Sequence, residues 1–288
     1  MEASPQTRRY DRSPSYRLYH ISSINSVDTT QLPLHYDADA ALVYFRRGDG
    51  SVRIEGRYYP ITAGDVVLLN PRELHCFTYH SGAHDRLVLY IREDIVRNFQ
   101  CPDPGFFDIF YHRSGSPGNH IPAAMAEACG IRTLMDQILS LTCEESGWNE
   151  ILAICRIVEL VAIIGRLHRE STGKEPPVVH ENGTVSQILR YINENLLSIP
   201  DTDQIARHFF RDKAYLCRLF KQHVGASLWN YVIFRRLLYS NDLIREGASI
   251  EEACYQSGFQ NYSNYFRLYK KYFGVSPSEF HRRSRCVS

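Results

Sequence analysis

The sequence has little that would suit a secreted or membrane protein. No apolar segment follows the early Arg8 and Arg9, so the pattern of a secretory signal is missing. The most apolar stretch, residues 151–165, is interrupted by Arg156 and Glu159 and is shorter than the roughly 20 residues that cross a bilayer. We therefore expect a cytoplasmic protein that does not associate with membranes.

Paired cysteines are also missing, although the chain contains eight cysteines. None of them forms a Cys-x-x-Cys pair, and none has the Cys/His spacing of a zinc site. We expect these thiols to be reduced and mostly structural, because a free cysteine on an apolar helix face behaves as a small hydrophobe. The 288 residues, 44% hydrophobic and 23% charged, fit a globular protein of about two ordinary domains.

An excess of charge of one sign is nearly absent overall, but the two parts of the chain differ. Residues 184–288 hold 15 Lys and Arg against 9 Asp and Glu, a net charge of +6. Because the whole chain carries +1, the remainder carries −5. The basic part is a candidate for contact with nucleic-acid phosphates, although the charge alone would also fit an ordinary solvated surface.

Short β-rich runs separated by turn residues occupy residues 31–93. Examples are LVYF, VRIEGRYYPI, VVLLNP and RLVLYI, with Gly and Asp between them. This spacing is typical of an all-β sandwich or barrel. We assign residues 21–115 to this β-domain. Residues 1–20 are treated as an N-terminal arm, which either folds over the domain or is disordered.

The pattern changes to helical periodicity in residues 116–170. Apolar residues recur at helical spacing in 131–143 and 149–168, which predicts two helices. These helices cover the β-domain, pair with a second copy of the chain in a homodimer, or do both. Residues 171–183 contain Gly, Pro and charge without periodicity, as in a linker. Residues 184–288 are helical by pattern, so the predicted fold class is α+β with several domains.

The C-terminal segment contains one unit twice. The stretch 215–231 (YLCRLFKQHVGASLWNY) aligns with 264–280 (NYFRLYKKYFGVSPSEF) at an offset of 49 residues, with identical Arg, Leu, Lys, Gly and Ser. A short helix and a tight turn precede each copy, and Gly258 suits the positive φ that such a turn often uses. The pattern predicts two helix-turn-helix units, at about 203–222 and 250–273.

The second helix of each unit is the predicted reading helix, whose outward residues reach base edges and phosphates in the major groove. Arg218 and Arg267 are the candidates for reading guanine, since a guanidinium bonds to O6 and N7 together; the alternative for each is a solvated charge. Two joined units would place their reading helices about 34 Å apart on one face of the duplex. The predicted DNA-facing residues are Lys213, Ala214, Cys217, Arg218 and Lys221 in the first unit and Tyr262, Ser263, Phe266, Arg267 and Lys270 in the second.

The segments 205–244 and 250–280 resemble the DNA-binding domain of the AraC/XylS family of bacterial transcription regulators. The most specific part of the resemblance is the stretch GFQNYSNYFRLYKKYFG at 258–274. It implies a sequence-specific regulator that binds double-stranded promoter DNA and, if it is an activator, contacts RNA polymerase. The small Ala214 and Cys217 stand at base-facing positions where the family often has larger polar side chains.

Residues 32–77 are similar to the cupin-like ligand domain of sugar-responsive members of the family, through the turns Gly64-Asp65 and Asn70-Pro71 and through His75. The similarity implies a barrel with a pocket in its mouth. We expect a small polar effector such as a sugar, because tyrosine rings and guanidinium groups suit ligands rich in hydroxyl groups. The candidate pocket residues are His35, Tyr44, Arg47, His75, Arg86 and Tyr90, each of which could instead belong to the core or the surface.

A metal site is not expected from the sequence. Metal-binding cupin enzymes use two histidines and a glutamate from one motif and a third histidine from another. This chain offers His35 and His75, with no second histidine near His35 and no glutamate on the following strand. Since three ligands are needed, we expect no metal, no cofactor and no catalysis. The alternatives are a cupin-type enzyme fused to a DNA-binding module, and a regulator controlled by a partner protein.

Overall fold

A computed structural model of the chain divides into two compact units, residues 1–179 and 180–288. The division falls inside the predicted linker, 171–183, most of which lies outside the described residues. The structure describes residues 6–10, 13–23, 30–31, 35–37, 39–55, 57–71, 73–80, 83–92, 95, 118–144, 146–171 and 183–285.

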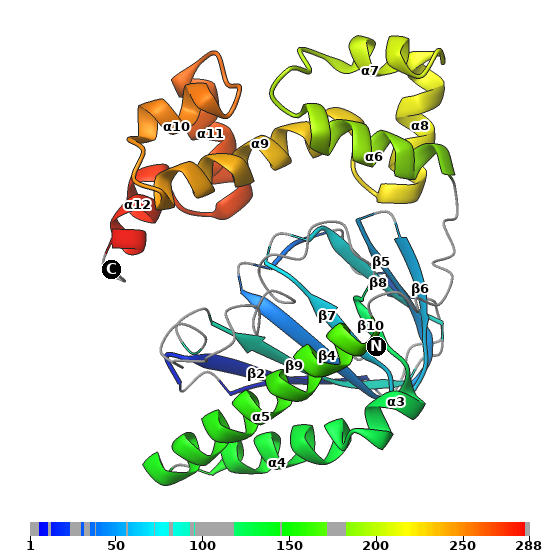
Figure 1. Ribbon diagram of the computed structural model, residues 1–288, viewed down its shortest axis with the longest axis vertical. Coiled ribbons are helices and arrows are strands. Elements are labelled where there is room, and N and C mark those ends of the chain that lie inside the picture. The colour runs from blue at the N-terminus through cyan, green and yellow to red at the C-terminus, as the bar shows by residue number, and fades with distance from the viewer. Residues whose placement is uncertain are drawn as a thin grey trace. The chain divides into compact units, whose positions relative to one another are not determined.

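The N-terminal unit contains two antiparallel sheets (Figure 1). The six-stranded sheet has the order β1 (Gln6–Tyr10), β2 (Tyr16–Ser23), β9 (His84–Ile91), β4 (Ala40–Arg47), β7 (Val66–Leu69) and β10 (His120–Ile121). The four-stranded sheet has the order β3 (Thr30–Gln31), β8 (His75–Tyr79), β5 (Gly50–Ile54) and β6 (Arg57–Ile61). The predicted cupin-like β-domain is confirmed, although the described strands form two separate sheets rather than one closed ring.

Side chains alternate between the two faces of the sheet along β4, and both faces are buried. The odd-numbered residues from Ala41 to Phe45 pack in a core between the two sheets. The even-numbered residues from Ala40 to Tyr44 pack in a second core with apolar residues of α4 (Ile131–Cys143) and α5 (Gly147–Ser171). Figure 1 shows both helices lying along this face of the sheet. The predicted helices at 131–143 and 149–168 are therefore present, and they cover the β-domain.

Two predicted boundaries in this unit are wrong. Residues 16–20, assigned to an N-terminal arm, lie in β2, which pairs with β9 from Tyr16 to Ser23. The segment 116–170 is not wholly helical, because β10 pairs with β7 before the short helix α3 (Ala123–Ala128) begins. Tyr16 and Leu18 are buried in the core that faces the helices. Tyr10 and Tyr16 of the supposed arm therefore pack in that core, whereas Tyr19 packs against the core between the sheets.

The C-terminal unit is all helical. The seven described helices are α6 (Gly183–Asn195), α7 (Thr202–His208), α8 (Lys213–Val224), α9 (Leu228–Arg245), α10 (Ile250–Gln256), α11 (Tyr262–Phe273) and α12 (Pro277–Arg285). Their ends follow sequence signals: the side chains of Asp212 and Ser227 accept bonds from backbone N–H groups, and Ser249 with Glu252 forms a capping box. Gly274 ends α11 in the left-handed conformation.

The two predicted helix-turn-helix units are α7–α8 and α10–α11. The long helix α9 contacts α8, α10 and α11, and Figure 1 shows it running from one unit to the other. In the second unit Gly258 takes the turn with φ of 87°, as predicted. No described helix combines the length and the apolar character needed to cross a membrane.

Candidate DNA-binding surface and ligand site

The reading helices α8 and α11 are each fixed by one buried side. On α11, Tyr265 and Tyr269 are fully buried, and their hydroxyl groups donate hydrogen bonds to Ser240 and Asn241 of α9. Burial raises the pKa of Tyr265 to about 12, so it stays a neutral donor. The buried residues of the two reading helices are Leu216, Phe220 and Val224 on α8 and Tyr265, Leu268 and Tyr269 on α11.

The opposite sides of the reading helices carry the predicted DNA contacts. Cys217 and Phe266 are half-buried. The exposed members of the set are Lys213, Ala214, Arg218 and Lys221 on α8 and Tyr262, Ser263, Arg267 and Lys270 on α11. Arg267 Nη2 donates to Asn264 Oδ1 at 3.0 Å, which holds the guanidinium along the outer face of α11. The placement suits the predicted base and phosphate contacts, which stay predictions.

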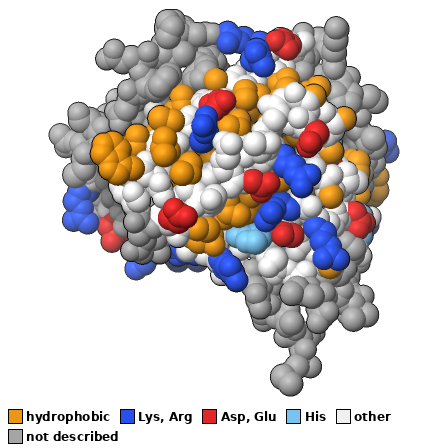
Figure 2. All heavy atoms as spheres, turned by 90° about the horizontal axis from the view of Figure 1, so that it is seen from below, with side chains coloured by type: hydrophobic (Ala, Val, Ile, Leu, Met, Phe, Trp, Pro, Cys, Tyr) orange, Lys and Arg blue, Asp and Glu red, His pale blue; other side chains and the backbone are white. Residues whose placement is uncertain are grey.

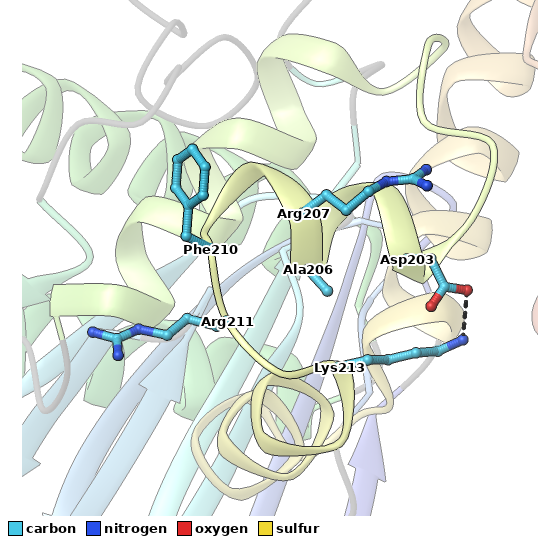
Figure 3. A pocket seen from close by; sticks show the side chains of 6 residues that line it. All are labelled: Asp203, Ala206, Arg207, Phe210, Arg211 and Lys213. Carbon is cyan, nitrogen blue, oxygen red and sulfur yellow. Dashed lines mark hydrogen bonds and ion pairs between the residues drawn. The ribbon is translucent and has the colours of Figure 1, made fainter.

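A shallow hollow lies beside the turn between α7 and α8 (Figure 3). Besides the predicted Lys213, it is lined by charged residues that were not predicted from the sequence. Lys213 Nζ lies 2.7 Å from Asp203 Oδ2, and this bond raises the pKa of Lys213. The pairing reduces the charge that Lys213 offers to phosphate. Arg207 and Arg211 are exposed nearby, and Phe210 stands out from the turn with 94% of its surface exposed and φ of 49°. The first unit therefore presents two further basic side chains and an unpacked aromatic ring.

Arg236 of α9 joins the connection between α6 and α7 to the turn of the second helix-turn-helix unit, and it was not identified from the sequence. Its Nη2 donates to the carbonyl oxygens of Ile199 at 2.6 Å and Leu196 at 3.1 Å, next to α7. Its Nη1 donates to the carbonyl oxygen of Gly258 at 3.1 Å, in the turn of the second unit. Only 7% of Arg236 is exposed, and its guanidinium lies over the ring of Trp229. One buried side chain thus ties the segment before α7 to the segment before α11.

Substitution of Gly258 by alanine is expected to lower the free energy of unfolding by about 1–2 kcal/mol, because the left-handed conformation is unfavourable for a residue with a Cβ. The new Cβ would also lie 3.0 Å from Arg236 Nε and 3.1 Å from Arg236 Cζ. Denaturant unfolding measures the change. Gly247→Ala, where φ is 103° but nothing lies within 4 Å, is the matched control for the steric part. Equal losses in both variants would show that the contact with Arg236 has no effect.

Four of the predicted ligand residues lie in the core between the sheets or beside it. His75 and Tyr90 are near one end of this interior, and Arg86 is near the other, where its Cζ lies 4.7 Å over the ring of Tyr79. Arg86 is 6% exposed, and burial lowers its pKa; burial also raises the pKa of Tyr79 to about 12. Arg86 Nη1 and the Tyr79 hydroxyl are buried without a hydrogen-bond partner among the described residues. They are donors available to a molecule in the interior.

The other end of the interior holds His35 and a carboxylate that sequence reasoning missed. Asp37 Oδ2 lies 3.5 Å from His75 Nε2, and the Tyr90 hydroxyl donates to Asp37 Oδ1 at 3.3 Å. Burial raises the pKa of Asp37 and lowers that of His75 to about 3. The prediction that only two metal ligands are present is therefore wrong, because Asp37 joins His35 and His75. Its spacing two residues after His35 was the signal in the sequence.

Two predicted pocket residues do not join this group. Tyr44 lies on the opposite face of β4, in the core with α4 and α5, because its position in the strand has the other parity. Arg47 is exposed at the end of β4. The predicted ligand residues that face the interior or lie at its end are therefore His35, His75, Arg86 and Tyr90, and the structure adds Asp37 and Tyr79 beside them.

Two family models match the chain. The AraC-like ligand binding domain matches residues 24–127, and a helix-turn-helix domain matches residues 205–283. The chain belongs to the AraC/XylS family of transcription regulators. It is a DNA-binding regulator with an N-terminal ligand-binding domain, as the resemblance of its sequence implied.

Similar curated proteins are transcription regulators. The arabinose operon regulatory protein of Escherichia coli (strain K12) is 26% identical over 238 residues, covering 81% of this chain and 77% of the relative. The lactose operon transcription activator of Staphylococcus xylosus is 21% identical, with 81% and 80% covered. Among solved structures, wild-type ToxT from Vibrio cholerae bound to an unsaturated fatty acid shares 15% identity and a TM-score of 0.39, covering 94% of this chain and 96% of that one.

Proposed function

We propose that a small polar molecule such as a sugar binds in the interior of the N-terminal domain and controls how a homodimer engages its operator. The observation that carries the proposal is the pair of buried donors without partners, Arg86 Nη1 and the Tyr79 hydroxyl. A buried polar group without a partner is unfavourable by about 1–3 kcal/mol, and oxygen atoms of a ligand would remove that penalty. Two similar regulators are named for the arabinose and lactose operons, which supports a sugar as the effector.

Control of DNA binding requires the effector to favour one arrangement of the protein. A molecule with equal affinity for two arrangements shifts neither population, however tightly it binds. Arg86 belongs to β9 and Tyr79 to β8, one strand from each sheet. A ligand that bonds to both side chains would therefore favour one packing of the two sheets. No chemical reaction is needed for this role.

Fluorescence anisotropy of operator DNA, titrated with the protein in the presence of pentoses and hexoses, tests the proposal. At least one sugar should change the affinity for DNA, and Arg86→Met should abolish the change while leaving DNA binding without sugar intact. Arg47→Met, which removes an exposed arginine from the same sheet, should respond like the unaltered protein. A sugar response that survives Arg86→Met, or no response to any sugar, would rule out this effector site.

The homodimer would use the outer face of α5. Trp148, Ile151 and Leu152 of this helix are 76%, 54% and 50% exposed, and Figure 2 shows apolar side chains gathered on this face of the N-terminal domain. An apolar patch of this kind is typical of a protein contact, and a symmetric contact suits two copies of one helix. RNA polymerase is the further partner expected of an activator.

Leu152→Glu is expected to shift the protein from dimer to monomer, because it places a charge within the apolar patch. Sedimentation velocity at several protein concentrations measures the change. Leu197→Glu, which alters a leucine of the C-terminal unit with 49% exposure, is the matched control and should stay dimeric. A Leu152→Glu variant that remains a dimer would place the contact elsewhere.

A further inference from the structure

Three side chains able to bind a metal ion converge at one end of the β-domain interior. His35, Asp37 and His75 each offer one ligand atom, and these atoms lie within 4.8 Å of one another. Two backbone hydrogen bonds, of 3.0 Å and 2.9 Å, join His35 to His75 and set their ring centroids 4.3 Å apart. The backbone thus fixes the two histidines side by side before any ligand is present.

The proton of His75 is on the nitrogen that faces away from the cluster. Nδ1 lies 2.9 Å from the carbonyl oxygen of Glu73, which can only accept, so Nδ1 must donate. A neutral imidazole carries one N–H, so the remaining nitrogen of this ring, Nε2, is an acceptor. Nε2 therefore presents a lone pair toward Asp37 Oδ2, which lies 3.5 Å away. With Asp37 ionised, two acceptor atoms therefore face each other.

The separation of these two atoms fits a bridging cation better than a shared proton. A hydrogen bond would bring them to about 2.7–3.2 Å. Two ligand atoms that each lie about 2.1 Å from a tetrahedral metal are about 3.4 Å apart, close to the 3.5 Å observed. We propose that a ring nitrogen of His35, the carboxylate of Asp37 and His75 Nε2 together bind one divalent first-row transition metal ion.

The surroundings of the cluster resemble those of a built metal site. The Tyr90 hydroxyl bonds to Asp37, and the Glu73 carbonyl orients His75; bonds of this kind commonly orient the ligands of bound metals. Two imidazoles with one carboxylate suit zinc or ferrous iron. Three protein ligands leave a coordination position open, which an oxygen atom of water or of a polar molecule would occupy. The ion would anchor such a molecule in the interior, and its binding requires neither DNA nor the sugar proposed above.

The test uses full-length protein that has been treated with a chelator and then titrated with Zn²⁺ by calorimetry and with Co²⁺ by absorption spectroscopy. One equivalent should bind per chain, without the sulfur-to-metal charge-transfer band that cysteine ligands would give. Loss of a residue that only orients a metal ligand typically weakens metal binding by about 10–100-fold. Asp37→Asn and His75→Gln remove the ligands themselves and should each weaken binding by at least this factor. His20→Gln is the matched control, since His20 pairs with Asp85 at 2.8 Å and belongs to no group of three such ligands among the described residues.

Thermal unfolding shows whether the variants bind metal as folded proteins. Zn²⁺ should raise the Tm of the unaltered protein and of His20→Gln. It should not raise the Tm of Asp37→Asn, in which the new side chain has nearly the same size and shape as the aspartate. If the unaltered protein binds no metal, or if Asp37→Asn binds it with equal affinity, the metal site is overturned. A proton shared by Asp37 and His75 would then be the remaining explanation of their contact. The sugar titration is repeated on chelator-treated protein, so that failure of one proposal does not imply failure of the other.

Discussion

Replacing Arg236 with methionine is expected to lower the free energy of unfolding of the C-terminal unit by about 3–5 kcal/mol. Methionine keeps part of the apolar stem and removes the donors to the carbonyl oxygens of Leu196, Ile199 and Gly258. Each buried acceptor that loses its donor costs about 1–3 kcal/mol. Denaturant unfolding of the full-length protein, followed by a probe specific to this unit, measures the change.

Arg190→Met is the control for this experiment, because Arg190 is exposed on α6 and should be replaceable within about 0.5 kcal/mol. At a temperature where it remains folded, the Arg236 variant should also lose affinity for operator DNA, since Arg236 ties the segment before α7 to the turn before α11. Unchanged stability of Arg236→Met would mean that the packing around α9, rather than this side chain, holds the two units.

Arg267→Ala is expected to weaken binding by about 1–3 kcal/mol at a single base position of the operator. Its guanidinium is exposed near the middle of α11, where Nη2 donates to Asn264, and a guanidinium can bond to O6 and N7 of guanine together. Competition between the operator and variants with each base changed in turn measures the loss. In the Arg267→Ala protein, changing the base that Arg267 contacts should cause no further loss of affinity.

Lys270→Ala supplies the comparison that separates base reading from phosphate contact. Lys270 is exposed one turn further along α11, so its loss should weaken binding to all sequences and reduce the salt dependence by about one unit of slope. Measurement at several salt concentrations gives this slope. Equal losses on operator and random DNA for Arg267→Ala would refute its role in base reading.

The helical unit was largely predictable because its signals are local. Caps such as Asp212 and Ser249, and glycines such as Gly258, act within a few residues of their own position. The repeat at an offset of 49 residues then fixed which helices correspond. The β-domain was predictable as a fold class for the same reason, since each strand lies between turn residues.

The contacts that organise the sites were not predictable, because they depend on tertiary neighbours. Arg236 bonds to carbonyl oxygens up to 40 residues away, and nothing in its local sequence marks them. Tyr44 and Arg47 were assigned to a pocket by residue type, whereas strand parity and position decide where each side chain points. Asp37 was not predicted, because metal-binding cupin enzymes use a glutamate on the next strand rather than an aspartate two residues after the first histidine.

Selection of bound DNA from a random library by the purified full-length protein, at stated salt, tests the central claim most directly. Two reading helices on one chain predict an enriched motif that spans two successive major grooves about 34 Å apart, and a dimer predicts its repetition. The same selection with Arg267→Ala should lose one base of the motif. Enrichment of no motif, or of one confined to a single groove, would contradict the account of two reading helices joined by α9.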